Sequence, residues 1–199
     1  MKQKLINASI QLFEQKGYKE TSVQDIVAMI GVTKGTFYYY FKSKDEVLKY
    51  ICLTFIEDLL YNQEIIVSQN AKTNTEKLHA IVYLLIENIG LKRKSARIFF
   101  REMKNFSESN LKEIKDKRDL FRLQLQQIVE AGVENGEFNV DITADIITFG
   151  ILGITNWSYY WYTPQGCISE KRLTEIYVDF ILNGIKGDNG SSQSRKIKA

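Results

Sequence analysis

Between residues 22 and 44 the chain gathers side chains that donate hydrogen bonds well. The candidate binding residues are Ser22, Thr33, Lys34, Gly35, Thr36, Tyr38, Tyr39 and Lys44. Lysine, threonine and tyrosine donate to phosphates and to base edges. From Ile26 to Lys44 the side chains are neutral or basic, as a phosphate-facing surface requires, because a carboxylate there would repel the phosphate charge.

Two short helices must position these groups. The first has an apolar face at helical spacing, made by Val23, Ile26, Val27 and Ile30. Ser22 with Asp25 predicts its N-terminal cap, Gly31 its end, and Thr33 the cap of the next helix. This pattern is typical of a helix-turn-helix, whose second helix can enter the major groove of DNA. Two amphipathic helices joined by a glycine turn also occur in all-helical proteins that bind no DNA.

Within the second helix the spacing assigns different roles to neighbouring residues. Phe37 and Phe41 lie four apart and are expected to pack on the first helix. Lys34, Thr36 and Tyr38 are expected in the groove or on its rim, with Tyr38 on a phosphate rather than a base. Gly35 would let the helix approach DNA closely. Of the next two tyrosines, Tyr40 is expected to be the more covered.

The first fifty residues closely resemble the DNA-binding domain of the TetR family of transcriptional regulators. The matching positions are Ala8, Leu12-Phe13, Gly17-Tyr18, Thr21-Ser22-Val23, Ile26, Gly31-Val32, Lys34-Gly35-Thr36, Tyr38, Tyr40-Phe41 and Ser43-Lys44. Ile30 and Phe37 depart mildly from the usual alanine and leucine or isoleucine. The resemblance implies double-stranded operator DNA as a partner, with Lys44 on a phosphate, and a helical body that binds a ligand and dimerises.

We therefore expect an all-α fold in three parts. Residues 1–46 form the helix-turn-helix domain, residues 47–186 the effector-binding and dimerisation domain, and residues 187–199 a flexible tail. The net charge of +3 fits this division, since residues 1–50 hold eight Lys/Arg and five Asp/Glu and the remainder nineteen of each. The single proline indicates long helices.

Helical patterns continue along the body. They cover about residues 4–16, 43–69, 74–91, 96–103 and 111–135, with a solvated turn at Lys92-Arg93-Lys94. Leu120 is among the residues expected inside. From Ile146 to Ser169 there is no charged residue, but Thr, Asn and Pro-Gln-Gly in this stretch argue against a membrane span. The stretch is expected to be buried in the core or against a second copy. With the last helix it would form the interface of a homodimer that reads a near-palindrome.

The effector is predicted to be a small hydrophobic molecule. Its candidate site residues are Phe99, Met103, Phe121, Phe149, Asn156, Trp157 and Tyr160, although each of them could equally be core or dimer contact. The ending with Trp157, Trp161-Tyr162, Pro164 and Gly166 is similar to that of fatty-acid-degradation regulators that answer to acyl-CoA. An acyl-CoA or fatty acid and a drug-like compound, as sensed by efflux-pump regulators of the family, remain equal alternatives.

Enzymatic activity is not expected. The chain has no phosphate loop, GxGxxG, paired metal ligands or nucleophile motif, and His79 is its only histidine. No cofactor, metal or catalytic residue is predicted. Two cysteines and the absence of an apolar leader favour the cytoplasm. The prediction is a ligand-responsive repressor; the alternative is a dimeric helical ligand-binding or interaction protein without DNA binding.

Overall fold

The structure, a computed structural model, describes residues 1–106, 108–138 and 143–185. These residues form eight α-helices and one short 3₁₀ helix, with no strand among them, so the predicted all-α class is confirmed. The elements are α1 (Lys2–Lys16), α2 (Val23–Met29), α3 (Lys34–Tyr40), α4 (Lys44–Val67), α5 (Asn74–Glu102), η1 (Met103–Asn105), α6 (Glu108–Glu134), α7 (Ala144–Trp161) and α8 (Glu170–Ile185).

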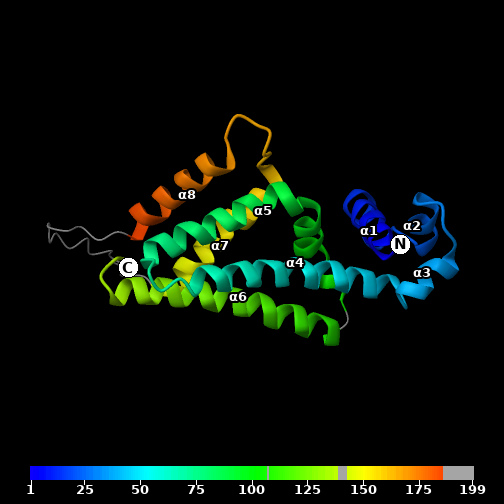
Figure 1. Cartoon of the computed structure of the whole chain (residues 1–199), viewed down its shortest axis with the longest axis horizontal. Coiled ribbons are helices and arrows are strands. Elements are labelled where there is room, and N and C mark those ends of the chain that lie inside the picture. Colours follow the sequence, from blue (N-terminus) through cyan, green and yellow to red (C-terminus); the bar gives the residue numbers. More distant parts are fainter. Residues whose placement is uncertain (107, 139–142, 186–199) are drawn as a thin grey trace, which may run out of the picture.

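Helices α1 to α3 form a head at one end of an elongated molecule, and α4 to α8 form the body (Figure 1). The head has its own apolar core, in which Leu5, Phe13, Ile26 and Phe37 are fully buried. α1 ends at Gly17, whose φ of 94° lies in the region that favours glycine. The long α4 leaves the head and runs along the body beside α6 (Figure 1).

The body is built around α5, which packs against α4, α6, α7 and α8. Its buried face carries aliphatic residues at helical spacing, such as Leu78, Ile81, Leu85 and Ile89. The turn predicted at Lys92-Arg93-Lys94 is instead a kink inside this helix, because Lys92 alone has non-helical dihedral angles (φ −134°, ψ 24°). The kink divides α5 into a long first segment and a short second segment that reaches toward α1 (Figure 1).

Leu120 was predicted inside but is exposed, because on α6 it lies one residue before the buried Phe121 and therefore points away from it. The predicted tail, residues 187–199, lies outside the described residues. No described helix has an apolar stretch long enough to cross a bilayer.

Candidate nucleic-acid interface and effector cavity

The turn between α2 and α3 is fixed by side-chain caps at both helix starts. Ser22 Oγ accepts from the backbone N–H of Asp25 at 3.1 Å, and the Ser22 backbone N–H donates to the Asp25 carboxylate at 2.9 Å. The hydrogen bonds from the Ser22 backbone and hydroxyl lower the pKa of the Asp25 carboxyl below its usual value. Thr33 Oγ1 caps α3 by accepting from Thr36 N–H at 3.2 Å. Gly31 supplies a φ of 68° between the two helices. The angle between α2 and α3 is therefore set locally.

The outer face of α3 carries most of the predicted binding residues. Ser22, Thr33, Lys34, Gly35, Tyr38 and Tyr39 are exposed, and Thr36 is half-buried. Phe37, on the opposite face, is completely buried and holds the helix on the head. The side chain of Tyr39 is 82% exposed while Tyr40 is half-buried, so the expected order of these two tyrosines is confirmed.

Gly35 is not required by the packing of the head. A Cβ atom there would lie 3.5 Å from Thr33 Oγ1, an ordinary van der Waals contact. The backbone at this position is helical, so no unusual dihedral angle requires glycine either. Because Gly35 has no side chain, the helix backbone itself lies at the outer surface at the start of α3.

Lys44 lies at the start of α4, as expected, and its amino group is turned into the head. Nζ donates to the backbone carbonyls of Tyr18 and Thr21, both at 2.6 Å, and lies 4.2 Å from the centre of the Tyr18 ring. Burial lowers the pKa of this amino group. The amino group therefore donates its hydrogen bonds to the loop between α1 and α2. The sequence alone did not show that this loop lies beside Lys44. The side chain therefore ties the start of α4 to that loop.

A second contact joins body and head through the short segment of α5. Arg97 Nη1 lies 3.0 Å from the Glu14 carboxylate of α1, and Arg101 donates to the backbone carbonyl of Phe13. The Phe13 carbonyl already accepts from the Gly17 backbone N–H at 3.0 Å, and the guanidinium donates to the same oxygen, which can accept two hydrogen bonds. Sequence reasoning missed this contact, since nothing along the chain links residues more than eighty positions apart.

A cavity of about 670 Å³ lies in the body between α4, α5, α6 and α7. Five of the seven predicted effector residues line it: Phe99, Met103, Phe121, Phe149 and Asn156. The residues that sequence reasoning did not single out are Phe55, Ile56, Leu59, Leu85, Phe100, Arg118, Asp119, Arg122, Leu152 and Gly153. The volume falls within the usual range of small-molecule sites, and the walls are largely aromatic and aliphatic.

Trp157 and Tyr160 do not line this cavity, contrary to expectation. Asn156 faces the cavity, and each following residue turns about 100° around the helix axis, which carries Trp157 to another face of α7. The rings of Trp157 and Tyr160 lie 5.2 Å apart, and both are exposed. Trp157 belongs instead to a hollow beside α8, together with Tyr177 and Phe180.

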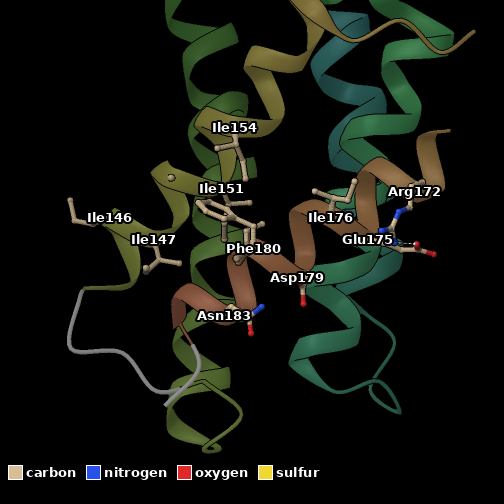
Figure 2. A pocket seen from close by; sticks show the side chains of 12 residues that line it. Ile146, Ile147, Ile151, Ile154, Arg172, Glu175, Ile176, Asp179, Phe180 and Asn183 are labelled. Carbon is tan, nitrogen blue, oxygen red and sulfur yellow. Dashed lines mark hydrogen bonds and ion pairs between the residues drawn. The ribbon is translucent and has the colours of Figure 1, made fainter. Parts of the chain in front are cut away.

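The opposite side of α7 faces a groove of about 990 Å³ shared with α8. Figure 2 shows Ile146, Ile147, Ile151 and Ile154 on its α7 side, and Ile176, Asp179, Phe180 and Asn183 on its α8 side. Phe180 and Ile146 are 69% and 56% exposed. An exposed apolar surface of this extent usually marks an interface.

Two models of known protein families match this chain. Residues 5–51 match the family model described as bacterial regulatory proteins, tetR family, and residues 71–185 match that of the tetracyclin repressor-like C-terminal domain. The chain belongs to the TetR family. It is a helix-turn-helix transcriptional regulator, and the stated resemblance of its first fifty residues is confirmed.

TetR-family relatives match along nearly the whole chain. The transcriptional repressor KstR2 of Rhodococcus jostii is 27% identical over 183 residues, which cover 91% of this chain and 89% of that protein. KstR2 of Mycolicibacterium smegmatis is 26% identical over 192 residues, covering 96% and 93%.

Solved structures share the fold. The ketosteroid transcriptional regulator KstR2 of Mycobacterium tuberculosis has a TM-score of 0.87 at 24% identity, covering 94% of this chain and 95% of that one. The regulator PfmR of Thermus thermophilus has a TM-score of 0.83 at 26% identity, covering 92% and 99%. AibR, solved with isovaleryl coenzyme A and operator DNA, has a TM-score of 0.80 at 19% identity, covering 91% and 97%.

Proposed function

We propose that this regulator is a repressor that binds a near-palindromic operator as a homodimer and is released by a small hydrophobic effector. The observation that carries the proposal is the outer face of α3, which presents hydroxyl and amino groups on a rigidly capped helix. Repression, as the direction of regulation, is supported by the names of the KstR2 relatives.

The proposed DNA contacts come from α3 and the two capping residues. Thr36, Tyr38 and Lys34 would enter the major groove or lie on its rim, and Gly35 would allow close approach. Ser22, Thr33 and Tyr39 would add contacts to phosphates. We assign Lys44 a different role from the one expected, since its donors already hold the loop between α1 and α2. In this proposal it orients the head rather than binding a phosphate as its main task.

The proposed dimer forms through the α7–α8 groove. Two copies that bury this groove against each other would remove its apolar residues from water, which favours association. A symmetric pair of heads can place two recognition helices about 34 Å apart, one turn of the duplex. The operator would then be a near-palindrome, because the symmetry of the protein is repeated in the DNA.

The effector is proposed to occupy the cavity between α4, α5, α6 and α7. An acyl-CoA, a fatty acid or a drug-like compound would each meet its apolar walls. Phe55 on α4 and Phe99 on the short segment of α5 both line the cavity, and both helices contact α1. A ligand that prefers a different placement of these helices would change the separation of the two heads and weaken operator binding.

The same proposal divides the chain between two tasks. Residues 1–46 would bind DNA, and residues 47–186 would bind the effector and dimerise. The protein would act in the cytoplasm, where it meets operator DNA, and its relatives in the comparisons are transcriptional regulators.

The test is a gel shift on the DNA upstream of its own gene. The full-length protein should retard this fragment at nanomolar concentration, and the affinity should fall steeply as salt rises, because phosphate contacts release counterions. Footprinting should show two half-sites one helical turn apart. Equal, weak binding to the operator fragment and to a random duplex of the same length would overturn the proposal in favour of a dimeric protein without operator recognition.

A further inference from the structure

The proposed effector cavity has two arginines at its edge. Arg118 and Arg122 line it from α6, whereas most of its other walls are aromatic and aliphatic. The two residues are four apart, so their side chains lie on one face of the helix about one turn from each other. Arg118 is exposed and Arg122 is half-buried, so both cations stay in contact with water while they line an apolar cavity.

Arg122 reaches across the edge of the cavity toward α7. Its guanidinium carbon lies 5.3 Å from the centre of the Phe149 ring, and Nη1 donates to the neutral amide oxygen of Gln126 at 2.9 Å. Within residues 1–106, 108–138 and 143–185, no carboxylate oxygen lies within 4.0 Å of this guanidinium. The contacts seen position the cation without neutralising it.

The nearby carboxylates offer limited competition. Arg118 pairs with Asp119 at 3.3 Å, but both side chains are about half exposed, so the pair is weak in water. Asp145, at the start of α7, already accepts hydrogen bonds from the Thr143 hydroxyl at 2.5 Å and the Ile146 backbone N–H at 2.8 Å. The hydrogen bonds from Thr143 and Ile146 and, less strongly, the charge of Arg122 lower the pKa of the Asp145 carboxyl, so Asp145 stays charged. The edge of the cavity therefore carries two positive charges with the carboxylates of Asp119 and Asp145 nearby, and neither carboxylate forms an ion pair with the Arg122 guanidinium within 4.0 Å.

We infer that the effector is an amphiphile with an apolar body and an anionic end group, and that Arg122 and Arg118 bind that end. The inference rests on the proposed role of this cavity as the effector site. The apolar body would lie among the phenylalanines and the anion would receive the charge-assisted hydrogen bonds that a guanidinium forms with a carboxylate or a phosphate. Both the carboxylate of a fatty acid and a phosphate of its coenzyme A thioester supply this chemistry.

The experiment measures binding of four probes with the same alkyl chain to the full-length protein by calorimetry, below their micelle concentrations. The probes are decanoate, decanoyl-CoA, 1-decanol and decylamine. At least one anionic probe should bind about tenfold more tightly than the alcohol, the gain expected for a hydrogen bond to a charged group. Tighter decanoate than decanoyl-CoA identifies a carboxylate, and the reverse order identifies a phosphate.

Three variants make the assignment specific to these arginines. Arg122→Gln should lose the preference for the anion while keeping its affinity for 1-decanol, and Arg122→Lys should keep part of the preference. Lys94→Gln is the matched control, since Lys94 is an exposed cation on α5 that lines neither the cavity nor the α7–α8 groove; it should bind all four probes as the wild type does. A preference that persists in Arg122→Gln would overturn the inference.

The remaining outcomes separate this inference from the proposed function. If neither decanoate nor decanoyl-CoA binds more tightly than 1-decanol, or if decylamine binds most tightly, the anionic end group is overturned but the cavity remains a hydrophobic effector site. If no probe binds while the protein still retards operator DNA, the cavity is not an effector site for such molecules, and the inference and the proposed release mechanism fail together.

Discussion

The head and the body expose opposite kinds of chemistry. In the head, the exposed residues of α3 are polar or small-sided, and the apolar residues such as Phe37 lie inside. In the body, α7 and α8 expose large apolar side chains, with Trp157 65% and Phe180 69% exposed. A polar surface is stable in water and can bind a polyanion when one is present, whereas an apolar surface of this size favours a permanent partner.

This difference predicts which substitutions should affect DNA binding and which should affect assembly. Changes on the outer face of α3 should weaken DNA binding and leave folding unaltered, because those side chains make few internal contacts. Changes on the apolar faces of α7 and α8 should act first on assembly, and on DNA binding only as a consequence. Lys44 and Glu137 break this simple division, since both are polar side chains that hold the structure together.

The largest effect is expected at the α7–α8 groove. Phe180→Asp places a carboxylate where two copies would exclude water, and an unpaired buried charge costs several kcal/mol. The variant should sediment as a monomer at micromolar concentration, and its operator affinity should fall about a hundredfold or more, because each head would then bind alone. Sedimentation velocity and gel shift measure the two results.

Leu91→Asp is the control for that substitution. Leu91 is an equally exposed apolar residue on α5, and it lies outside the groove. The control should remain a dimer with unchanged operator affinity. A Phe180→Asp protein that stays dimeric would place the interface elsewhere and remove the contrast between head and body.

Lys44→Met should destabilise the head. The substitution removes the Lys44 donor from the carbonyls of Tyr18 and Thr21, of which Tyr18 keeps the Thr21 N–H at 3.3 Å, and hydrogen bonds from a charged group are worth about 1.5–3 kcal/mol. The free energy of unfolding should fall by about 2 kcal/mol, measured by urea denaturation at a fixed protein concentration. In contrast, Lys42→Met, at an exposed site two residues earlier, should change it by less than about 0.5 kcal/mol.

Tyr38→Phe should weaken DNA binding without altering stability. It removes the hydroxyl and keeps the ring, whose edge contact with Phe37 has a centroid distance of 5.4 Å. Loss of one hydrogen bond to a charged phosphate should reduce operator affinity about tenfold. Thermal unfolding should be unchanged, and Tyr61→Phe, on an exposed tyrosine of α4, should change neither quantity. Equal operator affinity of Tyr38→Phe and wild type would show that this hydroxyl is not a DNA contact.

The sequence predicted the head well because its structure is determined locally. Ser22, Gly31 and Thr33 lie within a few residues of the groups that they cap, so the chain order alone reveals their partners. The same reasoning singled out five residues of α5, η1, α6 and α7 that line the cavity.

The rest depended on contacts between distant parts of the chain. The amino group of Lys44 could not be assigned to the carbonyl of Tyr18 from spacing, and Arg97 could not be paired with Glu14. Trp157 was misplaced because the sequence shows how residues are distributed around α7 but not which side of the helix faces the cavity. Long-range packing fixes that rotation, and here it turns Asn156 inward and Trp157 outward.

The smallest effect is expected at Glu137. This residue holds two parts of the body together, as Lys44 does in the head. Its carboxylate accepts from the backbone N–H groups of Asn74 and Thr75, at 3.0 and 2.8 Å, and so caps the start of α5 from the turn that follows α6. Partial burial raises the pKa of this carboxyl, but the hydrogen bonds from Thr75 and Asn74 outweigh burial and bring it below the ordinary 4.5.

A folded-state pKa below the unfolded value means that this carboxylate stabilises the protein above pH 4.5 and stops doing so as the pH falls through the lowered pKa. Glu137→Gln should therefore reduce the free energy of unfolding by about 1 kcal/mol at pH 7, as expected for loss of a helix cap. The difference from wild type should shrink below pH 4.5 in urea denaturation series. Glu134→Gln, at the exposed last residue of α6, should show neither change. A difference that stays constant down to pH 3 would assign the effect to shape rather than charge, and the parallel between Glu137 and Lys44 would then fail.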